Sequence, residues 1–224
     1  STVPLPFHTG RKPYEQIAFQ YSHHIYYEDG RIEHANEYIN STAGEFPNFE
    51  FIEHLQKALS NDEGTIFKYS THENTILNAI RAQLKASNTP NKESLVSFIE
   101  SISHHTTDNP DPWTVPTRKF NKGTRDMVDL CKVVKNYYYN PHTFGSNSIK
   151  KVLPAVLNSS QFVQEKYSKP IRTIGVSSKN LPKDHVWLKK LDNEIISPYK
   201  TLPPVHENIS QEEIEARLSN IDNI

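Results

Sequence analysis

The segment TIFKYSTHEN, residues 65–74, decides how the middle of this chain folds. Its first half is a short apolar run rich in aromatic and β-branched residues, which predicts a buried strand. In its second half, Ser70 and Thr71 stand directly before apolar residues at helical spacing, which predicts the start of a helix. Those apolar residues are Ile76, Leu77, Ile80 and Leu84. A buried strand that runs straight into a helix is typical of α/β proteins.

The flanking sequence predicts the remaining elements. Residues 14–27 are aromatic and β-branched, residues 28–31 (EDGR) have turn chemistry, and residues 32–39 resume the strand pattern, which together predict an antiparallel hairpin. Helical spacing predicts helices over residues 49–59, 92–101 and 150–157, the last interrupted near Pro154. A proline-rich loop is expected over residues 104–123, and a new strand or helix begins near residue 127.

The order of these elements predicts an α/β fold with a mixed sheet flanked by helices. We expect residues 1–157 to form this domain. Residues 158–224 contain prolines at intervals and isolated apolar clusters, so we expect an irregular appendage. Within it, Ser210 to Leu218 has a capping-box pattern that predicts a short helix packing on the same domain.

Charge and cysteine content narrow the possible functions. With 25 basic and 26 acidic residues the formal charge is -1, so a polyanion could be held only by a local patch. The single cysteine, Cys131, excludes an internal disulfide and suits a reducing compartment, which predicts a cytoplasmic location. No apolar run approaches the roughly 20 residues that cross a membrane. The oligomeric state stays open.

The first candidate site follows the predicted strand at residues 65–69. Side chains at the carboxyl end of a strand often bind ligands in α/β folds, so His72, Glu73 and Asn74 are candidates, with Glu73 able to hold a hard cation. The structural alternative is that Thr71 caps the helix and Glu73 interacts with its dipole.

Two further candidates lie downstream. Asp129, between Val128 and Leu130, could be a second carboxylate of the same cleft or the N-cap of a helix. The loop GSNSIKK, residues 145–151, combines small residues with lysines at a helix start, which suits a phosphate contact or a solvated turn. Its candidate ligand-binding residues are Ser146, Ser148, Lys150 and Lys151.

Four segments together resemble a known family. They are residues 13–22 (PYEQIAFQYS), 69–73 (YSTHE), 128–130 (VDL) and 145–154 (GSNSIKKVLP), the last being the most specific. They resemble a bacterial family called domain of unknown function 2779, over roughly residues 13–157 and at residues 197–204. That family is similar to ribonuclease H-like 3'-5' exonucleases, in which four acidic residues hold two divalent ions.

The resemblance implies a ribonuclease H-like fold and a Mg²⁺- or Mn²⁺-dependent phosphodiester hydrolase. Glu73 matches the acidic residue of the second exonuclease motif, and Asp129 matches a family aspartate; both are the implied catalytic and metal-binding residues. The family's first strand, with an acidic pair, would lie before Ser1, and its last aspartate would lie after Ile224. We therefore expect an incomplete site that is inactive by itself, or alternatively a non-catalytic scaffold that binds nucleic acid or protein.

Overall fold

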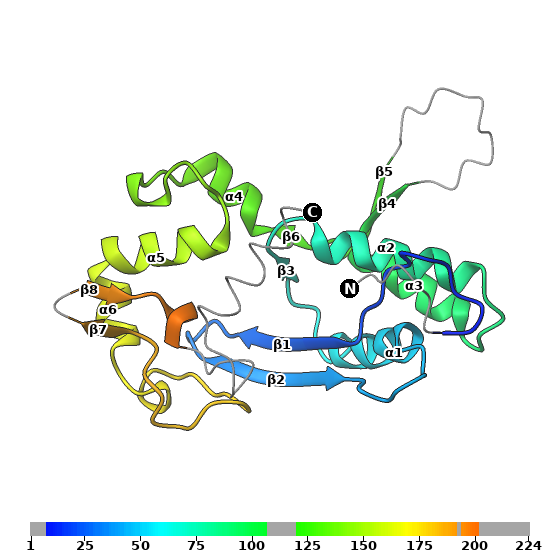
Figure 1. The fold of residues 1–224 in the computed structure, drawn as a ribbon, viewed down its shortest axis with the longest axis horizontal. Coiled ribbons are helices and arrows are strands. Elements are labelled where there is room, and N and C mark those ends of the chain that lie inside the picture. Colours follow the sequence, from blue (N-terminus) through cyan, green and yellow to red (C-terminus); the bar gives the residue numbers. More distant parts are fainter. Residues whose placement is uncertain (1–7, 107–119, 192–193, 202–224) are drawn as a thin grey trace, which may run out of the picture.

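Six α-helices and four pairs of short strands make up the part of the chain that the structure, a computed structural model, describes (Figure 1). That part comprises residues 8–106, 120–191 and 194–201. The helices are α1 (Asn48–Leu59), α2 (His72–Lys85), α3 (Lys92–Ile102), α4 (Leu130–Tyr137), α5 (Ile149–Ser159) and α6 (Gln161–Tyr167). The strands are β1 (Gln20–Tyr26), β2 (Ile32–Ile39), β3 (Phe67–Lys68), β4 (His104–Thr106), β5 (Phe120–Lys122), β6 (Val128–Asp129), β7 (Lys189–Leu191) and β8 (Glu194–Ile196).

The fold is mixed α/β, as predicted, but the described strands do not form one mixed sheet. They pair as β1–β2, β3–β6, β4–β5 and β7–β8. Only β3 and β6 run parallel, with Phe67 opposite Val128 and Lys68 opposite Asp129. Strands β1 and β3 do not pair with each other, and residues of both line one groove.

The predicted hairpin is confirmed. Its turn contains Gly30, whose φ of 86° lies in the left-handed region that favours glycine. The outer edge of β2 is partly covered, because Ile32 N donates to Gly175 O at 2.8 Å and His34 N donates to Ser177 O at 3.2 Å. The region after residue 158 therefore contacts the N-terminal hairpin.

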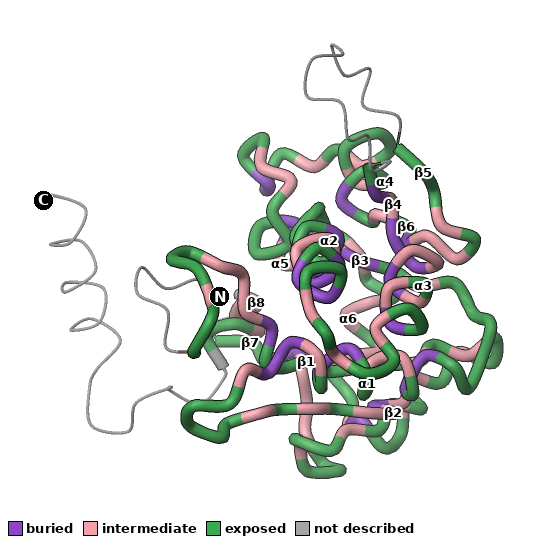
Figure 2. The backbone as a smooth tube through the Cα atoms, turned by 90° about the vertical axis from the view of Figure 1, so that its right-hand side faces the viewer, coloured by how far each residue is buried: buried purple, intermediate pink, exposed green. Residues whose placement is uncertain are grey.

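The hydrophobic core lies where α1, α2 and α3 pack against one another. Ile52, Ile80, Leu84 and Ile99 are each 0% exposed. Figure 2 shows buried stretches along α1 and α2, with exposed residues on the outer turns. Full burial of one such aliphatic side chain stabilises the fold by about 2 kcal/mol. This packing explains why helices predicted from apolar spacing have nearly the expected bounds.

Two predictions about local structure are wrong. The helix α5 is not interrupted at Pro154 but runs through it to Ser159. A proline there removes one backbone hydrogen bond, and the burial of Val152, Ala155 and Leu157 on the same helix offsets that loss. The region 104–123 is not a simple loop, because its two ends pair as β4 and β5.

The expected helix at Ser210–Leu218 lies outside the described residues. Within residues 8–106, 120–191 and 194–201, no helix has both the length and the apolar character needed to cross a membrane.

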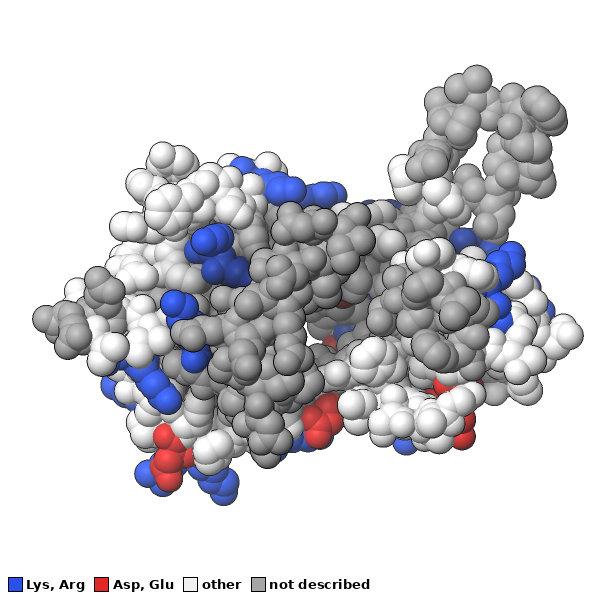
Figure 3. All heavy atoms as spheres, in the orientation of Figure 1, with Lys and Arg blue, Asp and Glu red and all other residues white. Residues whose placement is uncertain are grey.

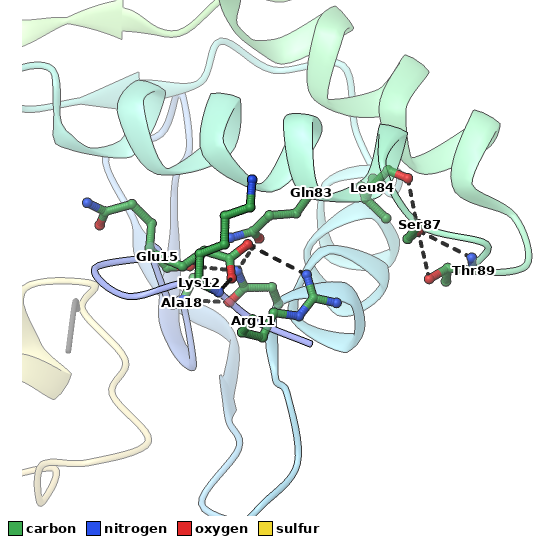
Figure 4. Close-up of polar contacts among 10 residues, drawn as sticks. Arg11, Lys12, Glu15, Ala18, Gln83, Leu84, Ser87 and Thr89 are labelled. Atoms are coloured by element: carbon green, nitrogen blue, oxygen red, sulfur yellow. Dashed lines mark hydrogen bonds and ion pairs between the residues drawn. The ribbon is translucent and has the colours of Figure 1, made fainter. Parts of the chain in front are cut away.

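Asn48 ties the start of the hairpin to the helices. Its Oδ1 accepts from Ala18 N at 2.8 Å, and its Nδ2 donates to Gln16 O at 2.9 Å and to Gln83 Oε1 at 2.6 Å. Figure 4 shows Gln83 extending from α2 toward the segment that carries Ala18. Because Asn48 is 0% exposed, Ala18 N and Gln83 Oε1 would lose their hydrogen bonds to it in the buried interior if the amide were removed, whereas Gln16 O would keep its bond from Gln83 Nε2.

We predict that Asn48→Ala lowers the free energy of unfolding by about 3 kcal/mol, since it leaves buried polar groups unpaired. Urea denaturation monitored by circular dichroism measures the change. Asn61→Ala is the matched control, because Asn61 is exposed, and it should change the stability by less than about 0.5 kcal/mol. Equal stability of the two variants would show that the Asn48 network contributes little.

Candidate functional site

A groove of about 1000 Å³ separates the hairpin from the β3–α2 segment. One wall is the strand β1 and the residues leading into it, from Ile17 to Tyr26. The opposite wall is formed by Thr65, Ile66 and Phe67, and by His72 and Glu73 at the start of α2. The groove therefore opens at the strand–helix junction at which the sequence places its first candidate site.

The β3–α2 junction is a sharp turn at Ser70, whose φ is 77°. For a residue with a side chain this left-handed conformation costs about 1 kcal/mol, so surrounding contacts must hold it. Thr71 takes the N-cap position of α2, but its hydroxyl makes no capping hydrogen bond. The turn directs the first residues of α2 to the rim of the groove.

His72 and Glu73 are exposed and line the groove. Among the described residues, Glu73 has no hydrogen-bond or ion-pair partner, so its carboxylate is free to accept a ligand. Its position in the first turn of α2 also suits the helix dipole, the alternative that the sequence left open.

Asn74 has a structural role. It is buried, its Nδ2 donates to His104 O at 3.0 Å, and its Oδ1 accepts from His104 N at 3.1 Å. The amide thus fastens α2 to the start of β4. Because both of its polar groups are in use, Asn74 is not open to the substrate for which the sequence suggested it.

Asp129 is the N-cap of α4. Its Oδ1 accepts from Cys131 N at 2.9 Å and from Ser70 N at 2.9 Å, which links α4 to the strained turn before α2. Desolvation alone would raise the pKa of Asp129. The backbone N–H groups of Ser70, Cys131 and Lys132, with the nearby Lys68 ammonium, outweigh desolvation and hold that pKa below its usual value.

Lys68 is the buried cation of this junction. It is 5% exposed, and its Nζ has no hydrogen-bond partner within the described part of the chain. It lies opposite Asp129 in the β3–β6 register. A buried ammonium there stabilises the ionised aspartate and would repel a second cation beside it.

The loop before α5 meets the same junction. Tyr69 Oη donates to Asn147 O at 2.7 Å, and the thiol of Cys131 lies 3.9 Å from the same carbonyl. Ser146 Oγ accepts from Ser148 N at 3.2 Å, and Ser148 is the N-cap of α5. The structure therefore brings together three sequence segments, around residues 70, 129 and 147, that lie far apart in the chain.

Lys150 and Lys151 occupy the first turn of α5 and are exposed. Figure 3 shows Lys and Arg side chains over the part of the molecule that contains α4 and α5. The exposed lysines of α4 are Lys132 and Lys135. A basic surface next to the junction can hold an anionic chain even though the whole protein is nearly neutral.

Sequence reasoning missed the groove and two residues that shape it. Arg125 donates to Leu59 O at 2.6 Å, Gly64 O at 2.8 Å and Asp62 Oδ1 at 2.6 Å, so it joins elements far apart in the chain. His23 lines the groove, and its buried Nδ1 has no hydrogen-bond partner among the described residues. Neither residue belongs to a motif, so no pattern in the sequence pointed to them.

The part of the chain that the structure describes contains no group of three or more His, Cys, Asp or Glu side chains that could hold a metal ion. Glu73 is one carboxylate at the groove, and tight binding of a divalent cation needs several oxygen ligands. The described residues therefore do not make a two-ion site by themselves.

Fold and site together define a class: a mixed α/β protein in which the start of one helix, next to a parallel strand pair, places an acidic residue at the rim of a groove. Residues 1–148 match the family described as domain of unknown function (DUF2779), and the chain belongs to this family. No match was found among curated proteins or among solved structures.

We predict that Asp129→Ala lowers the free energy of unfolding by about 1–2 kcal/mol, because α4 loses its cap and Ser70 loses its acceptor. Asp129→Asn keeps an acceptor oxygen and should cost much less.

Comparing the wild type with Asp129→Asn also tests how much the negative charge of Asp129 stabilises the fold. A carboxyl with a depressed pKa stabilises the folded state at neutral pH, and this contribution disappears as the pH falls through the folded-state pKa. Denaturation curves at several pH values should therefore show the wild type losing its advantage over Asp129→Asn in acid. A constant difference down to low pH would contradict this role.

Proposed function

We propose that this chain is part of a ribonuclease H-like, metal-dependent nuclease, and that residues 1–224 alone bind nucleic acid without cleaving it. The observation that carries the proposal is the strand–helix junction at residues 69–73: Ser70 bonds to Asp129, Tyr69 bonds to the lysine-bearing loop 145–151, and Glu73 lines the groove. In metal-dependent phosphodiester hydrolysis carboxylates hold the cation, and a basic surface can hold the nucleic-acid backbone.

Glu73 is the proposed metal ligand, because its carboxylate lines the groove without a partner among the described residues. Asp129 remains a second candidate through the oxygen that does not accept from Ser70 and Cys131, although Lys68 weakens that site. A bound Mg²⁺ or Mn²⁺ would supply the activated water and neutralise charge on the leaving oxygen. In this assignment His72 contacts substrate or water at the rim.

The proposed binding site for the nucleic-acid backbone is the start of α5. The hydroxyls of Ser146 and Ser148 and the ammonium groups of Lys150 and Lys151 can all contact phosphate oxygens. Hydrogen bonding between Tyr69 and Asn147 holds this loop against the junction that carries Glu73. A strand bound along α5 would therefore reach the groove.

The second candidate is a scaffold that keeps the fold, binds nucleic acid or protein, and holds no ions. One observation favours it: among the described residues no cluster of three metal-ligating side chains exists. In a scaffold, Glu73 would stabilise α2 by interacting with the helix dipole, and Asp129 would act only as the N-cap of α4.

Paramagnetic broadening by Mn²⁺ separates the two candidates, since it detects weak binding. We predict that Mn²⁺ broadens the NMR signals of residues 70–74, that Glu73→Gln abolishes the broadening, and that the control Glu63→Gln retains it. Glu63 is also exposed but does not line the groove. The unmodified chain should not cleave single-stranded DNA or RNA above background. Signals that stay sharp in the unmodified chain would favour the scaffold.

We further predict that Lys150→Ala combined with Lys151→Ala weakens binding to a single-stranded oligonucleotide. The slope of log affinity against log salt should fall by about 1.4, corresponding to two lost phosphate contacts. The control combines Lys57→Ala with Lys122→Ala, which removes two exposed lysines of α1 and β5. Fluorescence anisotropy measures the affinity of both double variants for the oligonucleotide. Equal effects of the two double variants would refute the proposed binding site at the start of α5.

A further inference from the structure

The surface around α4 and the start of α5 is basic, although the whole chain is nearly neutral. Residues 130–183 contain nine Lys or Arg residues and one acidic residue, Glu165, whereas residues 1–129 contain 12 basic and 17 acidic residues. Figure 3 shows Lys and Arg, and no Asp or Glu, on the visible surface around α4 and α5. A local positive field of this kind attracts a polyanion that the net charge of the chain would not attract.

Three aromatic side chains project from the turn that joins α4 to α5, residues 137–144, which we call the aromatic turn. Tyr137 is 85% exposed, Tyr139 is 88% exposed and Phe144 is 84% exposed. Tyr138, between the two exposed tyrosines, is half-buried and its hydroxyl lies in the interior, so it anchors the turn while its neighbours point outward. Within the described part of the chain, none of the three exposed rings stacks on another ring or on a cation.

Phe144 also adopts a backbone conformation that folding alone would disfavour. Its φ of 52° lies in the left-handed region, which is unfavourable for a residue with a large side chain. Because the ring is exposed, Phe144 buries little surface in return for this strain. A strained and exposed aromatic residue suits a position used for binding rather than for packing.

Lysines flank the aromatic turn on both sides. Two exposed lysines of α4 precede it and two at the start of α5 follow it, namely Lys132, Lys135, Lys150 and Lys151. The turn is also attached to the β3–α2 junction, because Tyr69 Oη donates at 2.7 Å to the carbonyl of Asn147, three residues after Phe144. Exposed rings and positive charges are therefore interleaved between residues 132 and 151.

We propose that Tyr137, Tyr139 and Phe144 form a stacking surface for the bases of a single-stranded nucleic acid, whose phosphates the neighbouring lysines bind. Every base has a flat face that can stack on an aromatic ring, so this combination binds single strands without reading their sequence. The base faces of a duplex are stacked on one another and do not reach these rings. The inference rests on the nucleic-acid binding of the proposed function and adds which form of nucleic acid is bound, and how.

Two other occupants fit this surface less well. An anionic membrane binds a continuous apolar face with lysines along its border, whereas the polar residues Asn136, Asn140 and His142 separate the exposed rings. The acidic segment 202–224 of this chain supplies negative charge but contains no Phe, Tyr or Trp to stack on them. A single strand provides both the charges and the flat rings.

An abasic oligonucleotide separates stacking from charge. The probes are a single strand of about twelve thymidines, an abasic strand with the same number of phosphates, and a duplex of the same length, each titrated with the whole chain. Fluorescence anisotropy measures the affinities. We expect the thymidine strand to bind at least about tenfold more tightly than the abasic strand, which is the effect of losing about one base–aromatic stack.

Two double variants separate the rings from the lysines. Tyr137→Ala combined with Tyr139→Ala should weaken binding of the thymidine strand by at least about tenfold, and should leave binding of the abasic strand, binding of the duplex and the salt dependence unchanged. Lys150→Ala combined with Lys151→Ala should instead weaken binding of all three probes and lower the salt dependence.

Phe144→Asn and Tyr14→Asn are a matched pair. Tyr14 is also an exposed aromatic residue in the left-handed region, with a φ of 58° and 68% exposure, and asparagine tolerates that conformation. Both variants should therefore melt at the same temperature as the wild type or higher, so that a loss of binding is not a loss of folding. Only Phe144→Asn should weaken binding of the thymidine strand, by at least about fivefold.

Several results would overturn the inference. They are equal affinities for the thymidine and abasic strands, aromatic variants that bind like the wild type, and equal effects of Phe144→Asn and Tyr14→Asn. Nuclear Overhauser effects from the three rings to residues 202–224 in the free chain would also overturn it. So would binding of vesicles of phosphatidylserine and phosphatidylcholine by a chain that binds no thymidine strand.

The stacking surface and the metal site can fail separately. If binding depends on the bases but Mn²⁺ leaves the signals of residues 70–74 sharp, the metal site proposed at Glu73 fails and the stacking surface holds. If Mn²⁺ broadens those signals but the thymidine and abasic strands bind equally, the stacking surface fails and the metal site holds.

Discussion

The buried amide of Asn48 is the interaction on which the rest of the structure depends. It stands at the first position of α1 and bonds to the chain entering β1 and to Gln83 near the end of α2. Since β1 forms one wall of the groove and the start of α2 belongs to the other, this amide fixes how the two walls are held relative to each other. A single buried polar side chain can do this because each of its bonds would be costly to lose in the interior.

A second constraint sets the electrostatics of the site. Ser70 is held in a left-handed conformation, Asp129 accepts its N–H, and Lys68 supplies a buried positive charge beside that aspartate. The Lys68 charge thus lies beside Asp129, whereas Glu73 at the groove rim has no such partner among the described residues. Two acidic residues that look equivalent in the sequence therefore differ in their electrostatic surroundings.

The separated strand pairs and the single carboxylate at the groove both leave binding groups without partners among the described residues. An edge that lacks a neighbouring strand leaves hydrogen-bonding groups open, and a single carboxylate leaves a divalent cation short of ligands. Both deficits lie along the same groove, between β1 and the start of α2.

The sequence by itself determined the local structure and the family. Apolar periodicity predicted α1, α2 and α3, turn chemistry at residues 28–31 predicted the hairpin, and the segments around residues 70, 129 and 147 pointed to the family that the chain matches. These features are local, so neighbouring residues are enough to specify them. Only the tertiary structure decided that β1 and β3 do not pair and that α5 continues through Pro154. It also decided that the Asn74 amide bonds to the backbone of His104 and that Lys68 lies buried beside Asp129. Each of these depends on groups distant in the chain, whose burial and hydrogen bonding no local pattern encodes.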